Sequence, residues 1–413
     1  MEFNDSFFGN ISYPYCIPYN YSSKDYIKLA EEFLYSDVDI ILHTFVLPLI
    51  LLVGITTNCA FLFVVYRIPS MRTVVNQYLT HIAIGDLLFL ITAIGKKILR
   101  FSATKNKYDS GMLWPHWMEI CTHIVNYTTI FASVLIMTLV GFERFYAVCR
   151  PMRLYAATTN QKMVKFLLAV VWILSAILAL TTIPGISMVS TYCVVWPDDP
   201  RFDDMPTVFD TYHHHSKAAF AYTALVQTVP FFVVMVINSV LYVKMVLTMS
   251  GRLGTMQAHD LDTQRNIDLR NKVAVMLIIN GVTFFTLTFP FQFASFVMGI
   301  MTLCKPNRPS SSITSEGTKT FLQMLLYCNS LINPIIYNAA NSRYRSAFLT
   351  AFGIDKLTWL RNRCVFRPRE YSTPLENGNN KESPTKNTVT TTYSNSYTTV
   401  ANGDILLESD TKC

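Results

Sequence analysis

Long apolar runs separated by short polar stretches dominate the chain from about residue 40 to residue 340. The runs span 40–66, 76–101, 118–143, 164–188, 217–248, 272–303 and 318–339. A helix of about 20 residues crosses a bilayer, and each run has at least that length. Because backbone groups in lipid must be paired within their own segment, the runs predict helices; barrel strands would be shorter and would alternate. The predicted fold is all-α, a seven-transmembrane helix bundle.

A short amphipathic stretch follows the seventh run. Between Ser342 and about Phe352, apolar side chains recur at helical spacing with two arginines between them: Arg343, Tyr344, Arg345, Phe348 and Leu349. This spacing predicts a short helix that lies on the membrane surface, in contact with lipid. The expected organisation is an N-terminal segment 1–39, the bundle 40–340, a membrane-proximal segment 341–364 with this helix, and a polar, Ser/Thr-rich, disordered tail 365–413.

Composition agrees with a membrane protein. Of the 413 residues, 51% are hydrophobic and 15% are charged, against about 25% charged in soluble domains. The net charge of +7 is spread thinly and forms no basic cluster, so nucleic acid is not expected as a partner. We see neither a nucleophile–base set nor metal-ligand spacing, so we do not expect an enzyme or a cofactor.

The N-terminal segment indicates the topology. It lacks a basic stretch followed by an apolar core, so we expect the first span to act as the signal anchor. Asn-x-Ser sequons begin at Asn4, Asn10 and Asn20 and predict glycosylation. The N-terminus is therefore expected outside the cell and, after seven spans, the C-terminus in the cytoplasm, as in a multi-pass plasma membrane protein.

Polar residues occupy similar depths in different spans. Asp86, Ser133, Asn329 and Asn333 each lie near mid-membrane when counted from the cytosolic end of their own run, as does Asn58. Such residues are costly in lipid and indicate function. They either bind the helices together by hydrogen bonds or form one site around Asp86 for a hard cation such as sodium.

Prolines at Pro184, Pro230, Pro290 and Pro334 are expected to interrupt four spans and to favour kinks. The kinks serve either packing or movement of the helices about hinges.

The third run ends in a charge pair, Glu143-Arg144, within FERF. Other spans carry GITTN ending at Asn58, HIAIGD ending at Asp86, Trp172, Pro230, FFTLTFP ending at Pro290, and NPIIY from Asn333 to Tyr337. In this order, one per span, these motifs resemble the rhodopsin-like (class A) G protein-coupled receptors over residues 40–364.

The resemblance implies an activation apparatus that couples to a heterotrimeric G protein. Glu143 would restrain Arg144 until activation, and Tyr337 would swing inward; Phe284, Pro290, Asn333 and Pro334 complete the set. Asp86, Ser133, Asn329 and Asn333 would hold an allosteric sodium ion. Two departures stand out: Thr288 replaces the usual tryptophan, and Arg270 stands where some members have a glutamate.

Two disulfides are also implied by the resemblance, and the local sequence indicates a lipid anchor. Cys121 would pair with Cys193 between the third helix and the second outer loop, and Cys16 with Cys304, as in some peptide receptors. Cys364, among basic residues, is a palmitoylation candidate.

A ligand pocket between the third, fifth, sixth and seventh helices is implied as well. The positions that face it are Asn126, Tyr127, Ile130, Gln227, Gln292, Gln323 and Tyr327, with Lys96 near the outer face. Asn126 replaces the aspartate of amine receptors, so a buried amine would lack its counter-ion. Tyr327 replaces the retinal-binding lysine of opsins.

The charged residues of the outer loops do not decide which chemical class of ligand the chain binds. Aspartates 198, 199, 203, 204 and 210 would attract a basic peptide, or are simply solvated, whereas Lys96, Lys97 and Arg100 favour an acidic ligand. The fifth helix and the missing tryptophan resemble invertebrate FMRFamide-type receptors, which favours a neuropeptide. The alternatives are a lipid or small-acid ligand and, distantly, a transporter.

Two further features have competing interpretations. His213, His214 and His215 either bind zinc or sense pH, or are solvated loop residues. The Ser/Thr-rich tail either receives phosphates from receptor kinases and recruits arrestin, or is unstructured filler.

Overall fold

The computed structural model describes residues 17–22, 26–110, 115–150, 161–253, 261–304 and 316–354, without the side chains of 252, 253, 261–266 and 316. The helices are α1 (Ile27–Glu31), α2 (Asp37–Ile41), a π-helical turn (Leu42–Val46), α3 (Leu47–Arg67), α4 (Val74–Ala103), α5 (His116–Cys149), α7 (Gln161–Thr181), α8 (Lys217–Leu253), α9 (Leu261–Cys304), α10 (Glu316–Ala340) and α11 (Ser342–Ala351). The strands are β1 (Ile17–Asn20), β2 (Met188–Val195) and β3 (Val208–His213).

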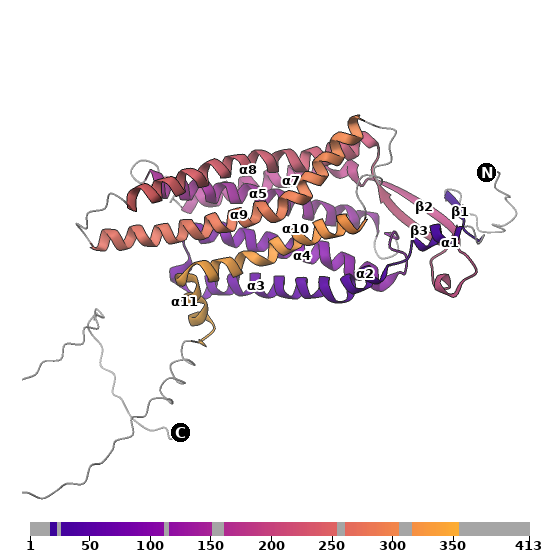
Figure 1. Ribbon diagram of the computed structural model, residues 1–413, viewed down its shortest axis with the longest axis horizontal. Helices are drawn as coiled ribbons and strands as arrows, with labels where there is room; N and C mark the ends of the chain where they lie inside the picture. Colours follow the sequence, from indigo (N-terminus) through magenta and orange to yellow (C-terminus); the bar gives the residue numbers. More distant parts are fainter. Residues whose placement is uncertain are drawn as a thin grey trace, which may run out of the picture. The chain divides into compact units, whose positions relative to one another are not determined.

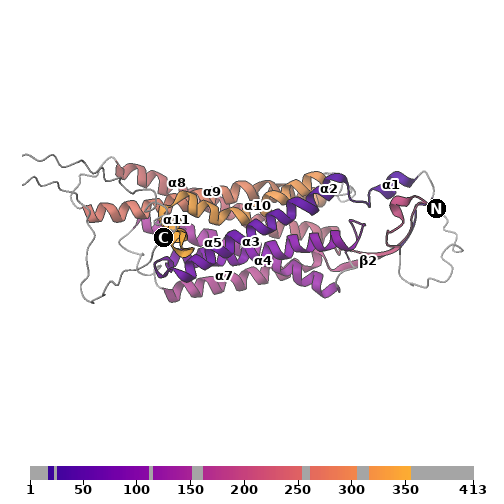
Figure 2. The ribbon, with the colours of Figure 1, turned by 90° about the horizontal axis from the view of Figure 1, so that it is seen from below.

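Each predicted span corresponds to a long helix, and these helices pack side by side as a bundle (Figure 1). α5 lies at the centre and contacts α4, α7, α8 and α9, while α3 closes the other side against α4 and α10. Figure 2 shows the same bundle after a quarter turn, with α7 along one edge. The prediction of a seven-helix bundle is confirmed.

Five helical segments are long and apolar enough to cross a membrane on length and composition alone: 37–67, 116–149, 161–181, 217–251 and 267–304. α4 and α10 are less apolar because they carry polar residues that the fold buries, including Asp86, Asn329 and Asn333. Side chains that lower the hydropathy of these helices thus face other helices rather than lipid.

The prolines fall in two kinds of position. Pro230, Pro290 and Pro334 lie inside α8, α9 and α10, as predicted. Pro184 does not interrupt a span, which corrects our prediction: α7 ends at Thr181, and Pro184 lies in a 3₁₀ turn, Ile183–Gly185. Proline suits such a turn because its ring fixes φ near the value needed and its missing N–H is not required.

The predicted amphipathic stretch forms α11. The Asn341 side chain accepts a hydrogen bond from the Arg343 N–H at 2.9 Å and caps the helix start. Tyr344 is buried and its hydroxyl donates to the Asn76 Oδ1 atom of α4. Gly353, at φ 71°, follows the helix in the left-handed conformation that glycine adopts without strain. α11 is thus anchored to the bundle on one face.

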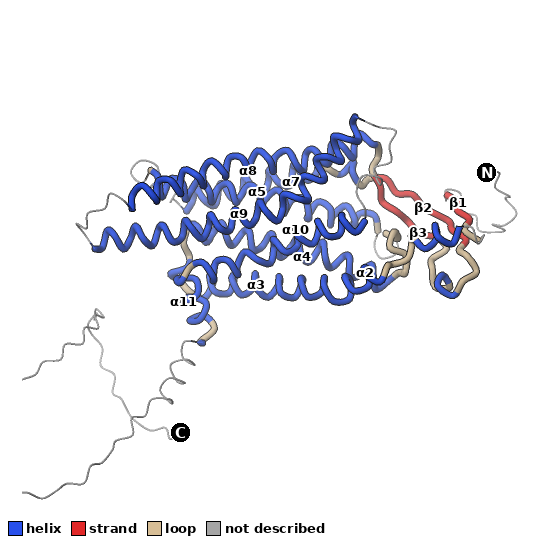
Figure 3. Tube along the Cα trace, viewed as in Figure 1, coloured by secondary structure: helices blue, strands red, loops and turns tan. Residues whose placement is uncertain are grey.

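A three-stranded sheet, absent from our all-α prediction, lies at the opposite end of the bundle (Figure 3). β2 is central: it runs parallel to β1, with Pro18 opposite Cys193, and antiparallel to β3, with Tyr192 opposite Phe209. Tyr21, Phe202 and Phe209 are buried around it. We call this the sheet end of the bundle and the other the α11 end.

Candidate functional site

A cavity of about 30 Å³ lies in the middle of the bundle. It is lined by Asp86, Phe89, Thr129, Ile130, Ser133, Val134, Phe284, Thr288, Leu326, Asn329 and Ser330. The Asn333 Nδ2 atom donates to the Asp86 Oδ2 atom at 2.8 Å. The residues predicted for a cation site, Asp86, Ser133, Asn329 and Asn333, therefore come together from α4, α5 and α10. The volume exceeds the 10–15 Å³ that a single water needs.

Unpaired oxygen atoms in this mid-bundle cavity suit a hard cation. The Asn329 Oδ1 and Thr288 Oγ1 atoms are buried and make no hydrogen bond within the described chain. Together with the Asp86 carboxylate they provide oxygen ligands, which hard cations prefer. Asn58 instead holds two helices together by hydrogen bonds, the alternative role that we considered for these polar residues. Its Nδ2 atom donates to the carbonyls of Gly54 and Ser330, at 2.9 Å each, and joins α3 to α10.

The α11 end holds the Glu143–Arg144 pair. The Arg144 Nη2 atom donates to Glu143 Oε1 at 2.7 Å, and Arg144 Nε donates to Glu143 Oε2, so the guanidinium binds both carboxylate oxygens. Both side chains are largely buried, and they line a cavity of about 390 Å³ with Arg72, Arg270 and Arg343. Glu143 is therefore in position to restrain Arg144, as the resemblance implied.

Tyr337 lies between this α11-end cavity and the middle of the bundle. It is almost fully buried, with its ring 5.3 Å from that of Phe61 and 5.9 Å from that of Tyr344. Nearby, the Asn238 Nδ2 atom of α8 donates to the Thr138 hydroxyl of α5 at 3.1 Å. Ring contacts of Tyr337 thus join α10 to α3 and α11, and a separate hydrogen bond joins α8 to α5.

A third cavity, of about 190 Å³, lies between α5, α8, α9 and α10 near the sheet end. Tyr127, Gln227 and Gln323, all predicted to face a ligand, line it with His214 and Lys319. Gln292 lies against it, since the Gln227 Nε2 atom donates to Gln292 Oε1 at 3.3 Å. Amide and hydroxyl groups from several helices therefore converge in this sheet-end pocket.

The other residues predicted for the ligand lie elsewhere. Ile130 lines the mid-bundle cavity, and Asn126 accepts a hydrogen bond from Thr92. The Tyr327 ring packs 5.8 Å from that of Phe89. Lys96, which we expected to meet the ligand, is instead paired with Glu119 of α5.

The neighbouring lysine is the one that reaches toward the pocket. Lys97 donates to the pocket residue Gln323, and its Nζ atom lies 5.6 Å from the centre of the Tyr327 ring. Adjacent residues of a helix point about 100° apart, so the two lysines cannot both face the pocket. Because Lys96 pairs with Glu119, Lys97 is the lysine that faces the pocket. No motif pointed to Glu119; its only signal was a carboxylate at the start of an apolar run.

Both predicted disulfides are wrong. Cys121 and Cys304 are free thiols, as are Cys59, Cys149 and Cys328. Cys193 is disulfide-bonded, so its partner lies outside the described residues. Cys121 is exposed, whereas Glu119, two residues earlier, is buried against α4; two helical residues differ by about 200° in direction. Cys193 is held within the sheet instead.

Other predicted modification sites fall mostly outside the described residues: Asn4, Asn10, Cys16 and Cys364. Asn20 is described and exposed at the end of β1, where its Oδ1 atom accepts from the Ser22 hydroxyl at 2.6 Å. This sequon is therefore accessible, and its glycosylation stays a prediction.

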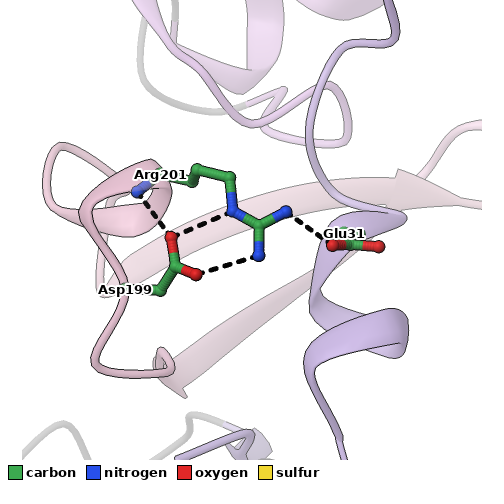
Figure 4. Close-up of polar contacts among 3 residues, drawn as sticks. All are labelled: Glu31, Asp199 and Arg201. Atoms are coloured by element: carbon green, nitrogen blue, oxygen red, sulfur yellow. Dashed lines mark hydrogen bonds and ion pairs between the residues drawn. The ribbon is translucent and has the colours of Figure 1, made fainter.

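Part of the acidic β2–β3 loop is neutralised within the chain. Arg201 holds both oxygens of Asp199 at 2.9 Å and reaches Glu31 at 2.6 Å (Figure 4). These hydrogen bonds lower the pKa of Asp199 to about 2. Lys105 pairs with Asp204 at 2.5 Å and lowers the pKa of that carboxyl too. The loop is consequently less acidic toward a ligand than its composition suggests.

The three consecutive loop histidines, 213–215, lie in different environments. His214 lines the sheet-end pocket, and burial lowers its pKa, whereas His213 and His215 are exposed. In the described part of the chain, no group of three or more His, Cys, Asp or Glu side chains is placed to hold a metal ion. The arrangement gives the zinc interpretation no support.

Comparison with known proteins agrees with this geometry. Residues 57–337 match the model of the family described as 7 transmembrane receptor (rhodopsin family). The chain belongs to this family and is a multi-pass membrane receptor rather than an enzyme.

Curated relatives are similar across most of their length. Somatostatin receptor type 5 of Rattus norvegicus is 25% identical over 73% of this chain and 74% of its own. Substance-K receptor of Mus musculus is 26% identical over 73% of both chains. Neuromedin-U receptor 2 of Rattus norvegicus is 26% identical over 73% of this chain and 72% of its own. The finer resemblance to FMRFamide-type receptors stays a prediction.

Proposed function

We propose that this chain is a cell-surface receptor that binds an extracellular neuropeptide and activates heterotrimeric G proteins. The sheet-end pocket carries the proposal, because Tyr127, Gln227 and Gln323 offer it neutral hydrogen-bonding groups suited to peptide amides. The similarity to the somatostatin, substance-K and neuromedin-U receptors supports the same class of ligand.

In this proposal the sheet end lies outside the cell and the α11 end in the cytoplasm. The exposed sequon at Asn20 supports that orientation, since glycosylation takes place on the outer side. The G protein would meet the α11-end cavity, where Arg144 is held by Glu143. Arrestin, receptor kinases, a palmitate on Cys364 and membrane lipid belong to the same proposal.

A sodium ion in the mid-bundle cavity is proposed as an allosteric ligand. Asp86 supplies the charge, while Ser133, Asn329 and Thr288 supply further oxygen atoms. A cation there stabilises the arrangement of α4, α5 and α10 that surrounds it, so conformations that close the cavity would expel the ion.

A peptide screen tests the proposed function. The chain is expressed with a promiscuous G protein and a calcium reporter, and amidated and free-acid neuropeptides are applied. We expect a submicromolar response that Arg144→Ala abolishes while surface expression and peptide binding persist. Silence across the library, with surface expression confirmed, would contradict a peptide ligand. It would favour the lipid or small-acid alternative, for which Lys97 and Lys319 are the cations nearest the pocket.

A further inference from the structure

A fourth cavity, of about 390 Å³, opens in the sheet and is separate from the sheet-end pocket between the helices. Each strand contributes rings to it: Tyr19 from β1, Tyr192 from β2, and Phe209, Tyr212 and His213 from β3. The Tyr19 and Tyr192 ring centres are 5.6 Å apart, as are those of Tyr192 and Phe209. We call this surface the aromatic groove. Its volume lies within the range of about 300–1,000 Å³ found for ligand pockets.

Of the Tyr19, Tyr192 and Phe209 rings, two are accessible, because Tyr19 is exposed and Tyr192 is half-buried, whereas Phe209 is buried. The Tyr19 side chain is 43% exposed, although it lies on the face that the other two rings share. Tyr108, from the connection between α4 and α5, forms a further wall and packs on Phe33 at 5.4 Å. Open aromatic faces in a hollow of this size mark a binding surface rather than core.

The charge of the groove favours a cation. Glu32 lines it and is exposed, and the described lining includes His213 but no lysine or arginine. Arg201 and Lys105 pair with carboxylates outside the lining. The electron-rich faces of aromatic rings attract cations within about 6 Å of the ring centre. The Tyr108 ring already binds a cation in this way, since the Lys107 Nζ atom lies 5.2 Å from its centre.

We propose that the aromatic groove binds an arginine side chain of an extracellular peptide, at a site distinct from the pocket between the helices. The planar guanidinium stacks on the rings of Tyr19 and Tyr192 and pairs with the Glu32 carboxylate at the rim. The inference rests on the proposed peptide-receptor function, and it adds a specificity site on the N-terminal segment.

Direct binding to the full-length chain in lipid nanodiscs tests the proposal. The probes are fluorescein-labelled octapeptide amides with one arginine each, every one paired with a twin in which citrulline replaces arginine. Citrulline keeps the planar shape and removes the charge. We expect arginine peptides to bind about tenfold more tightly than their twins, which corresponds to about 1.4 kcal/mol and lies within the range of cation–π contacts.

Matched variants locate the effect. Glu32→Gln and Tyr19→Leu should reduce the arginine-to-citrulline ratio to about one, whereas Tyr19→Phe keeps the ring and should preserve it. Asp203→Asn, at an exposed carboxylate outside the groove lining, should leave the ratio unchanged.

Three outcomes would overturn the proposal: no arginine peptide binds, the twins bind equally, or the preference persists in Glu32→Gln and Tyr19→Leu. Calcium responses to an agonist from the peptide screen separate this inference from the proposed function. If an agonist activates these variants and the unmodified chain equally, the receptor function is supported and the role of the groove is contradicted. If arginine peptides bind preferentially but no peptide acts as an agonist, the role of the groove is supported and the receptor function is contradicted.

Discussion

The ion pair between Lys96 of α4 and Glu119 of α5 should stabilise the sheet end of the bundle. The two side chains are only 20% and 10% exposed. Glu119→Leu would leave a buried ammonium without its counter-charge. Removing one partner of a fully buried pair costs about 3–5 kcal/mol, and an exposed pair contributes about 0–1 kcal/mol. The residual exposure of both side chains places the expected loss between these two ranges and just below the buried one, at about 2–3 kcal/mol.

Thermal unfolding of the full-length chain in nanodiscs, followed by tryptophan fluorescence at one scan rate, measures this loss. We expect Glu119→Leu to lower the apparent Tm by several degrees. The double variant Lys96→Met/Glu119→Leu should recover most of the loss, because both charges are then removed. Glu31→Gln is the control: it breaks an ion pair whose side chains are 50% and 42% exposed, so the Tm should hardly change.

Two results would refute this reasoning. Glu119→Leu could match Glu31→Gln, which would show that the helix-to-helix pair contributes no more than a surface pair. The double variant could also be less stable than Glu119→Leu alone, which would mean that packing of the side chains, not their charge, provides the stabilisation.

Three further predictions concern signalling and stability. In the unmodified chain, replacing choline chloride with sodium chloride should weaken agonist binding; in Asp86→Asn the two salts should give equal affinities in competition binding, and a retained sodium effect would contradict the site. Glu143→Gln should raise basal GTPγS binding several-fold because a neutral amide restrains Arg144 less; unchanged basal activity would mean that Glu143 does not restrain it. Tyr344→Phe removes the hydroxyl that donates to Asn76, so it should cost about 1–2 kcal/mol in thermal unfolding, and a neutral effect would show that water replaces the bond.

The helices and the depth of their polar residues were predictable from the sequence. Lipid requires each span to pair its own backbone, so long apolar runs become helices, and a constant rise of 1.5 Å per residue converts sequence position into depth. Counting residues therefore placed Asp86, Ser133 and Asn333 at one level, and the structure brings them together.

Direction around a helix was harder to predict than depth. Lys96 and Lys97 differ by one residue, yet only Lys97 reaches the sheet-end pocket. Cys121 lies two residues after Glu119 and faces away from α4. In both cases a shift of one or two positions rotates the side chain by 100° or 200°, and the partner that selects the direction comes from another helix.

The sheet was not predicted from the sequence, because its first strand, IPYN, is only four residues long and contains a proline. Such a segment has too little alternation to be recognised, and its pairing with β2 joins residues far apart in the chain. β2, MVSTYCVV, is rich in β-branched residues but follows the fourth apolar run directly, so the run was extended to residue 188.

One face of α9 links the sheet-end pocket to the middle of the bundle without the usual tryptophan. Gln292, Thr288 and Phe284 are spaced four residues apart and so lie on one face of the helix. Gln292 meets the pocket residue Gln227, while Thr288 and Phe284 line the cavity around Asp86. A ligand that draws the Gln227 amide away would leave Gln292, which is fully buried, without its partner, and a shift of α9 near Pro290 could restore that hydrogen bond. The threonine at 288 has no ring to rotate, so we expect activation here to proceed by rearranged hydrogen bonds and movement of the whole helix.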